Sequence, residues 1–181
     1  NAWGGFLGLI RTALPQHHFA ASGRFGFDSL QGFDVLIPTM SKVGRKQLAT
    51  ADRLRLIQQC GAGLEGVDRQ AAEEMNIAVA NVPSAISGNA DSVAELGIYI
   101  MIGLSRNFRE MAASIAGGKT GTPQGRALTG KTVGIIGLGG IGRALARKLK
   151  PFDVRLLGIK RHDPQQAKEE LGLDWAGTPA D

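Results

Sequence analysis

The chain has 181 residues, of which 43% are hydrophobic and 20% charged, and it carries a formal net charge of +5 at pH 7. This length suffices to bury a core in one or two domains. The longest apolar run, residues 96–104, is much shorter than the roughly 20 residues of a membrane span, and the single cysteine excludes an internal disulfide. We therefore expect a soluble protein of a reducing, cytoplasmic compartment.

The excess of Lys and Arg does not indicate a nucleic-acid surface, because these residues are spread over helix faces and are not gathered with aromatic side chains. The histidines do not suggest a metal centre either. His17 and His18 are adjacent, so that they would point in opposite directions in a strand, and His162 stands alone. We expect no nucleic acid, membrane or metal ion as a partner.

Residues 3–82 alternate between helical and strand patterns. An amphipathic helix is predicted first, at residues 3–14. It is followed by a weak strand at residues 17–21, a buried strand at 34–38, a helix at 42–50, a strand at 54–59, a helix at 69–75 and a strand at 77–82. Such alternation predicts a parallel sheet with helices packed on it.

The next predicted helix, residues 91–106, is apolar nearly all round, which predicts that it is buried on several sides. Ser92 and Glu95 have the spacing of a capping box that could begin this helix. A start near Asn89, with Glu95 inside the helix, is equally open. A shorter helix near residues 108–116 and a glycine-rich connector, residues 117–130, follow.

A strand, a glycine turn, a helix and a second strand follow one another in residues 131–161. The apolar run 132–136 leads directly into Gly137-Leu138-Gly139-Gly140-Ile141-Gly142, which has the spacing G-x-G-x-x-G. The helix ends at Pro151, and residues 154–159 form a second apolar run. One more helix is predicted at residues 164–171.

Each glycine of the turn has a mechanical purpose. Gly137 permits the tight turn, Gly139 leaves room for a pyrophosphate near the backbone, and Gly142 lets the helix lie close to the strand. The exposed amides and the positive end of the helix dipole then form an anion site. The pattern predicts dinucleotide binding; a tight structural turn in another α/β protein is the alternative.

Three blocks together resemble the D-isomer-specific 2-hydroxyacid dehydrogenases. They are QCGAGLEGVD at residues 59–68, GNADSVAELGIYIMIGLSR at 88–106 and GKTVGIIGLGGIGRALARKLKPF at 130–152. The resemblance implies a Rossmann-type NAD(P)-binding domain inserted into a flavodoxin-like substrate domain, both incomplete in this chain. We assign residues 1–88 to the substrate domain and 89–181, including the linker helix 91–106, to the first half of the cofactor domain.

The resemblance also implies roles for residues of the glycine-rich loop and of the turn. The amides of Ala62 and Gly63 match those that hold the substrate carboxylate, and a glycine-rich turn can present two such donors to an anion. A simple packing turn is the alternative. Gly140 and Ile141 match the pair whose backbone lies against the cofactor pyrophosphate.

Three further polar residues lie near these positions. Asn89 matches a substrate-binding asparagine of formate-dehydrogenase-like members, with helix capping as an equal alternative. We interpret Glu65 and Asp68 as structural, in a turn and as an N-cap, because hydride transfer from a 2-hydroxy acid needs no anion beside the substrate carboxylate.

The choice of cofactor depends on the position about 20 residues after the glycine turn, where NAD-preferring proteins place an acidic residue on the ribose. Counted as in the family, this position is Lys160, and Arg161 follows it. Two cations favour the 2′-phosphate of NADP(H). The alternative is that both end the strand in solvent and that His162 or Asp163 reaches the ribose of NAD.

The resemblance implies an oxidoreductase that reduces 2-keto acids to D-2-hydroxy acids, or the reverse, and that dimerises through its cofactor domain. Together with the apolar helix, this predicts a homodimer built largely through residues 91–116 and the following connector; burial of the helix within one chain is the alternative. The family's catalytic Arg, Glu and His are expected beyond Asp181, so we expect this chain to be inactive alone. A strand is also expected before Asn1. The alternatives are a dinucleotide-sensing, corepressor-like interaction module of the same fold and a truncated, inactive gene product. The sequence does not name the keto acid.

Overall fold

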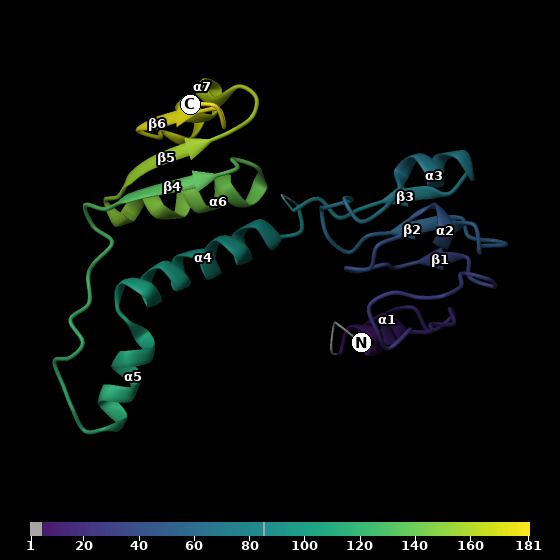
Figure 1. The fold of residues 1–181 in the computed structure, drawn as a ribbon, viewed down its shortest axis with the longest axis horizontal. Helices are drawn as coiled ribbons and strands as arrows, with labels where there is room; N and C mark the ends of the chain where they lie inside the picture. Colours follow the sequence, from purple (N-terminus) through teal and green to yellow (C-terminus); the bar gives the residue numbers. More distant parts are fainter. Residues whose placement is uncertain (1–4, 85) are drawn as a thin grey trace. The chain divides into compact units, whose positions relative to one another are not determined.

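The computed structural model describes residues 5–84 and 86–181, and the chain divides into two compact units, residues 1–83 and 84–181 (Figure 1). Both units are α/β with parallel strands. The assignment of a substrate domain and a cofactor domain divided after residue 88 stays a prediction, because a compact unit does not by itself carry a function.

The first unit is built on a parallel sheet in the order β1-β2-β3. Its strands are β1 (Val35–Leu36), β2 (Leu56–Gln58) and β3 (Ala78–Ala80), and its helices are α1 (Phe6–Ala13), α2 (Arg45–Leu48) and α3 (Arg69–Glu74). Ile57, in the middle strand, is fully buried among Leu48, Val43 and Ala71. The sequential strand order is the one expected for the last three strands of a flavodoxin-like sheet.

The predicted strand at residues 17–21 is wrong. Residues 18–21 have no regular secondary structure. Instead, the Arg11 guanidinium donates a hydrogen bond to the Phe19 carbonyl at 2.7 Å, and the rings of His17 and Phe19 meet edge to face. The Phe19 carbonyl, which would pair with a neighbouring strand in a sheet, is thus hydrogen-bonded to a side chain of α1. The predicted start of α1 at Trp3 lies outside the described residues.

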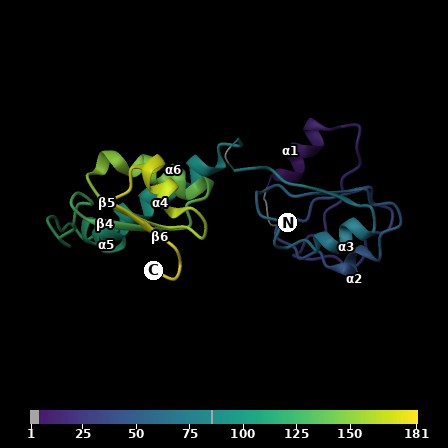
Figure 2. The same cartoon turned by 90° about the horizontal axis from the view of Figure 1, so that it is seen from above.

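The second unit contains a parallel sheet in the order β4-β5-β6. It consists of β4 (Thr132–Ile136), α6 (Gly140–Leu149), the 3₁₀ turn η1 (Lys150–Phe152), β5 (Arg155–Ile159), α7 (Pro164–Leu171) and β6 (Trp175–Gly177). Because successive crossovers are right-handed, α6 and α7 lie on the same face of the sheet, where Leu149 and Leu171 are buried (Figure 2). This is the first half of a Rossmann-type fold.

Helix α4 (Asn89–Ser105) packs against α6, and α5 (Phe108–Ala116) follows it. Helix α4 begins at Asn89 after Gly88, whose φ is 71°, so Glu95 lies inside the helix and Ser92 is not its N-cap. The Glu95 carboxylate instead accepts a hydrogen bond from the Lys148 ammonium at 2.9 Å. Of the two predicted starts, the structure has the earlier one.

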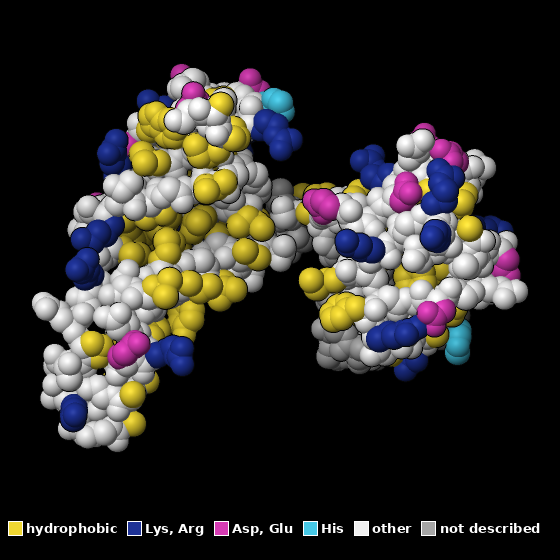
Figure 3. Space-filling view, in the orientation of Figure 1, with side chains coloured by type: hydrophobic (Ala, Val, Ile, Leu, Met, Phe, Trp, Pro, Cys, Tyr) yellow, Lys and Arg dark blue, Asp and Glu magenta, His cyan; other side chains and the backbone are white. Residues whose placement is uncertain are grey.

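The prediction that the apolar helix α4 is buried on several sides is wrong for this chain. Only Ala90 and Ala94 of α4 are buried, while Leu104 is 74% and Tyr99 60% exposed. Figure 3 shows hydrophobic side chains gathered along this helix. Because α6 covers only one side of α4, the apolar residues on its other side face outward.

No helix among the described residues is both long and apolar enough to cross a membrane.

Candidate functional site

The glycine turn lies between the end of β4 and the start of α6. Gly137 has a φ of 94° and donates its amide to the Ile159 carbonyl at 2.9 Å, which ties the turn to β5. A Cβ on Gly142 would lie 2.0 Å from the Gly137 carbonyl oxygen, so only glycine allows the helix to pack this closely. The positive φ of Gly137 and the close packing at Gly142 therefore each require a glycine, whether or not a ligand binds.

The third glycine of the motif, Gly139, faces open space. Its φ is −79°, and a Cβ placed on it would meet no heavy atom of the described residues within 4 Å. In the described part of the chain, the amides of Gly139, Gly140 and Ile141 donate to no protein acceptor. Unpaired N–H groups at a helix start, beside space that no side chain fills, fit the pyrophosphate of a dinucleotide.

A pocket of about 340 Å³ opens beside this turn at the carboxyl ends of β4 and β5. It is lined by Ile136, Gly137, Leu138, Gly139, Ile159, Lys160, Arg161 and Pro179. The pocket is therefore lined by apolar side chains, by glycines of the turn and by two cationic residues. Pro179, which follows β6, was not predicted, because the three-residue strand Trp175–Gly177 that brings it there shows no sequence periodicity.

Lys160 and Arg161 lie where the sequence predicted them, directly after β5. The Lys160 amide donates to the Gly177 carbonyl at 2.9 Å, so its backbone is fixed by β6. The pKa of Glu170 is lowered, mainly by its hydrogen bond with the Arg143 guanidinium and to a smaller extent by the nearby charge of Lys160. Asp163 is the N-cap of α7, with a φ of 50°, and its side chain makes no capping hydrogen bond.

The predicted substrate loop, residues 61–68, follows β2 in the first unit. Among the described residues, the amides of Ala62 and Gly63 have no protein acceptor. The Ala62 carbonyl accepts a hydrogen bond from the Asn81 side-chain amide at 2.7 Å, and the Gly61 carbonyl accepts one from the Val82 amide at 3.1 Å. The carbonyls are thus held by the segment after β3, and the role of the two amides in holding the substrate carboxylate stays a prediction.

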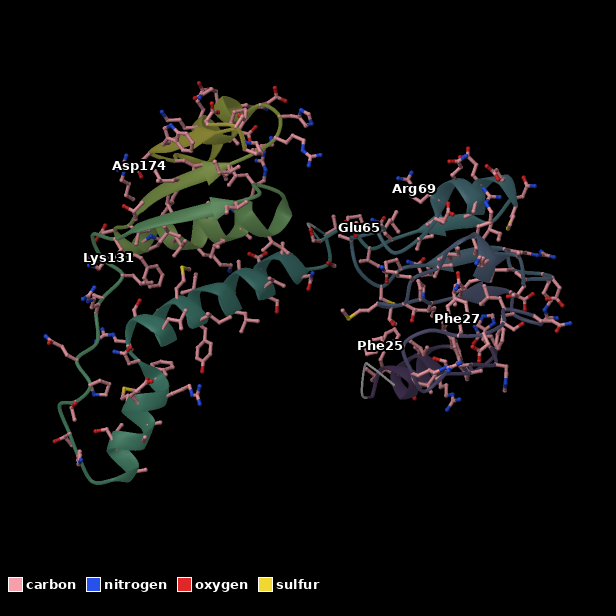
Figure 4. All side chains as sticks on the ribbon, in the orientation of Figure 1. Phe25, Phe27, Glu65, Arg69, Lys131 and Asp174 are labelled. Atoms are coloured by element: carbon pink, nitrogen blue, oxygen red, sulfur yellow. The ribbon has the colours of Figure 1, made fainter. Side chains whose placement is uncertain are left out.

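Glu65 lies in this loop, close to the start of α3 at Arg69 (Figure 4). Its carboxylate reaches back over Gly63, where the Oε2 atom lies 2.3 Å from the position of a Cβ. Asp68 is the N-cap of α3 and accepts the Ala71 amide at 2.9 Å, which confirms its structural interpretation. Burial raises the pKa of the neighbouring Cys60 thiol, which therefore stays protonated at neutral pH and is a poor nucleophile.

Asn89 is the first residue of α4 and is exposed. Its amide donates to the Ser87 hydroxyl at 3.4 Å, and the N-cap of α4 is Gly88. The side chain of Asn89 therefore does not cap its own helix. Its role in substrate binding stays a prediction.

Comparison with known proteins places these features in a family. Residues 98–179 match the family described as D-isomer specific 2-hydroxyacid dehydrogenase, NAD binding domain. The chain is 33% identical over 150 residues to D-3-phosphoglycerate dehydrogenase of Methanocaldococcus jannaschii, covering 81% of this chain and 28% of that protein. It is 32% identical to hydroxypyruvate reductase of Thermotoga maritima, covering 78% of this chain and 45% of that protein.

A solved structure is similar as well. It is the NAD-dependent formate dehydrogenase from Staphylococcus aureus in complex with NAD, with a TM-score of 0.72 and 30% identity over 90% of this chain and 51% of that one. The chain thus spans about half or less of the length of these proteins. Through its glycine turn, its sheet order and these similarities, residues 98–179 are identified as part of an NAD-binding domain of the D-isomer specific 2-hydroxyacid dehydrogenase family.

Proposed function

We propose that the protein to which this chain belongs is an NAD(P)-dependent oxidoreductase that interconverts 2-keto acids and D-2-hydroxy acids. The observation that carries this proposal is the glycine turn, where three consecutive unpaired amides and open space at Gly139 adjoin a pocket at the carboxyl ends of two parallel strands. By their names, the relatives mentioned above act on D-3-phosphoglycerate, hydroxypyruvate or formate.

The residues of this chain would bind and orient the reactants. The amides of Gly139, Gly140 and Ile141, at the positive end of the α6 dipole, would hold the pyrophosphate. The amides of Ala62 and Gly63 would hold the substrate carboxylate, and the Glu65 side chain, which is exposed, would turn away from Gly63 when that anion arrives. When bound, the nicotinamide supplies the hydride acceptor or donor for C2 of the acid.

Proton transfer to or from the C2 oxygen needs a group that titrates near neutral pH. The family resemblance implies a Glu-paired His and an Arg for this step, and none of His17, His18 and His162 matches that histidine. Cys60 is a poor candidate for this step, because burial raises the pKa of its thiol further above neutral pH. The residues of this chain would therefore bind the reactants, and the Glu-paired His would transfer the proton.

A steady-state assay of the full-length protein tests this proposal. We expect reduction of glyoxylate, hydroxypyruvate or pyruvate with NADPH or NADH, and oxidation of the D but not the L enantiomer of a 2-hydroxy acid. Calorimetric titration of the same protein with each dinucleotide separates binding from turnover. Dinucleotide binding without turnover of any 2-keto acid would favour the dinucleotide-sensing alternative, and the absence of binding would refute both.

We propose NADP(H) as the favoured cofactor, with NAD(H) as the alternative. The support is the pair Lys160 and Arg161, which line the pocket after β5, where a carboxylate would repel a 2′-phosphate. The family itself is described as NAD-binding. NAD(H) therefore stays the alternative, with Asp163 as a residue that could hydrogen-bond its ribose.

We also propose that the protein is a homodimer formed through α4, α5 and the connector 117–130. The support is a stripe of exposed apolar side chains on α4: Val93, Leu96, Ile100 and Leu104. Ile115 of α5 is also an exposed apolar residue, with 63% of its surface accessible. The corner between the helices is well packed, since Gly103 lies against the ring of Phe108, and this ring meets Tyr99 at 5.9 Å between centroids.

A further inference from the structure

We infer that the hydroxyl of Ser84 is a further ligand of the dinucleotide pyrophosphate, and that Gly140 is glycine in order to leave room for it. This inference rests on the proposed dinucleotide site. Neither the glycine motif nor the family resemblance points to Ser84, which lies in the segment that leads into α4.

The first observation is the contact between Ser84 and the start of α6. A Cβ placed on Gly140 would lie 2.5 Å from the Ser84 Oγ atom, 3.7 Å from its Cβ and 3.8 Å from the Cβ of Ala90. The Ser84 hydroxyl therefore occupies the space that a side chain at the first residue of α6 would take. Helices α4 and α6 begin at the same end of the unit in Figure 1, which brings the two segments together.

The second observation is that this hydroxyl has no hydrogen-bond partner among the described residues. The Ser84 carbonyl accepts the Ala90 amide at 3.3 Å and the Ser87 hydroxyl at 3.5 Å, so the backbone of Ser84 is anchored. The side chain is half-buried. Among the described residues, this hydroxyl and the three amides of Gly139, Gly140 and Ile141 are therefore neighbouring donors without acceptors. An anion bound between them could accept hydrogen bonds from all of them.

The chemistry of the group is suitable. A hydroxyl can donate its proton to a phosphate oxygen while α6 supplies backbone donors from the other side. A hydrogen bond to a charged acceptor contributes about 1.5 kcal/mol at the low end, which corresponds to roughly a tenfold change in affinity. The Ser84 hydroxyl would thus supply the polar contact that Gly140, without a side chain, cannot make.

The test is a calorimetric titration of wild type and Ser84→Ala with NADPH or NADH, whichever the wild type binds more tightly, and with ADP and adenosine. We expect Ser84→Ala to lose about tenfold in affinity for the dinucleotide and for ADP, with unchanged affinity for adenosine and an unchanged melting temperature. Ser92→Ala is the matched control, because Ser92 is an exposed serine of the same unit, and it should bind as wild type.

A double-mutant cycle tests the link to Gly140. In the wild-type background, Gly140→Ala should force the Ser84 hydroxyl away and lower affinity about as much as Ser84→Ala does. In the Ser84→Ala background the same change should cost nothing, because the nearest remaining atoms, at 3.7 and 3.8 Å, are in ordinary contact. An equal cost in both backgrounds would refute the link.

The other outcomes are distinct. If the wild type binds a dinucleotide and Ser84→Ala binds it equally well, the role of Ser84 is refuted and the proposed function stands. If Ser84→Ala weakens adenosine as much as ADP, the effect is structural and the role of Ser84 is again refuted. If the wild type binds no dinucleotide, both proposals are refuted.

Discussion

Lys160 is the residue on which the choice of cofactor depends. We expect Lys160→Asp to shift the ratio of NADPH to NADH efficiency by tenfold or more towards NADH, roughly 1.4 kcal/mol in transition-state binding. The reason is that the substitution replaces attraction for a 2′-phosphate by repulsion. Steady-state kcat/KM values with both cofactors, measured on the full-length protein, give the ratio.

A matched control for this substitution is Lys131→Asp. Lys131 precedes β4 at the end of the sheet opposite the glycine turn, as Figure 4 shows, so the charge change is the same but distant. The ratio should not change in this variant. An unchanged ratio in Lys160→Asp would remove the NADP(H) assignment and leave Asp163 as the residue to test.

Two glycines of the turn should respond differently to the same substitution. Gly142→Ala places a Cβ 2.0 Å from a backbone oxygen, so it should destabilise the fold by about 1–3 kcal/mol or more. The Cβ of Gly139→Ala meets no atom of the described residues within 4 Å, so the melting temperature should stay the same. The dinucleotide affinity of Gly139→Ala should nevertheless fall more than tenfold, because its Cβ takes the space of the pyrophosphate.

Thermal melts and titrations of the two variants distinguish these effects. Gly139→Ala that binds as wild type would show that no phosphate approaches this turn. The sequence predicted all three motif glycines, because their spacing is local. It did not predict Ser84, since only the tertiary fold brings this residue to Gly140.

Helices α6 and α7 are joined by the ion pair of Arg143 with Glu170. Hydrogen bonding to the Arg143 guanidinium lowers the pKa of Glu170, with a smaller contribution from Gln166. A carboxyl group whose pKa is lower in the folded state stabilises the fold above its unfolded pKa, about 4.3, and this contribution disappears as the pH falls through the folded pKa.

We therefore expect Glu170→Gln to melt at a lower temperature than wild type at pH 7, and the difference between them to be smaller at pH 3. The reason is that protonation of wild-type Glu170 removes the same charge that the substitution removes. Thermal melts at a series of pH values measure the difference. A difference that is equal at both pH values would show that the ion pair does not contribute.

The elements with strong local signals were predicted best. Residues 108–116, 132–136 and 164–171 have the predicted bounds, because helical or strand periodicity and flanking turn residues agree there. The three-residue β6 was missed, since its pairing with β5 and not its own sequence makes it a strand. Apolar character alone did not predict burial in α4, because burial depends on how many neighbours cover a helix.

At the scale of the whole molecule, the exposed stripe of α4 predicts self-association. We expect the full-length protein to be a dimer in light scattering, and Leu104→Arg to shift it towards the monomer, because a charge would be buried in an apolar contact. Leu9→Arg, a change at a 70% exposed leucine of α1 in the first unit, is the control and should leave the mass unchanged. A monomeric wild type would refute the proposal.

The position of Trp175 makes the indole a natural optical reporter. Its ring lies over Gly177, with the Cη2 atom 2.4 Å from the position of a Cβ, and the Gly177 carbonyl accepts the Lys160 amide at the rim of the pocket. The chain has two tryptophans, and the other, Trp3, lies outside the described residues. In the full-length protein, quenching by a reduced nicotinamide that is lost in Trp175→Phe would follow cofactor binding without any added dye.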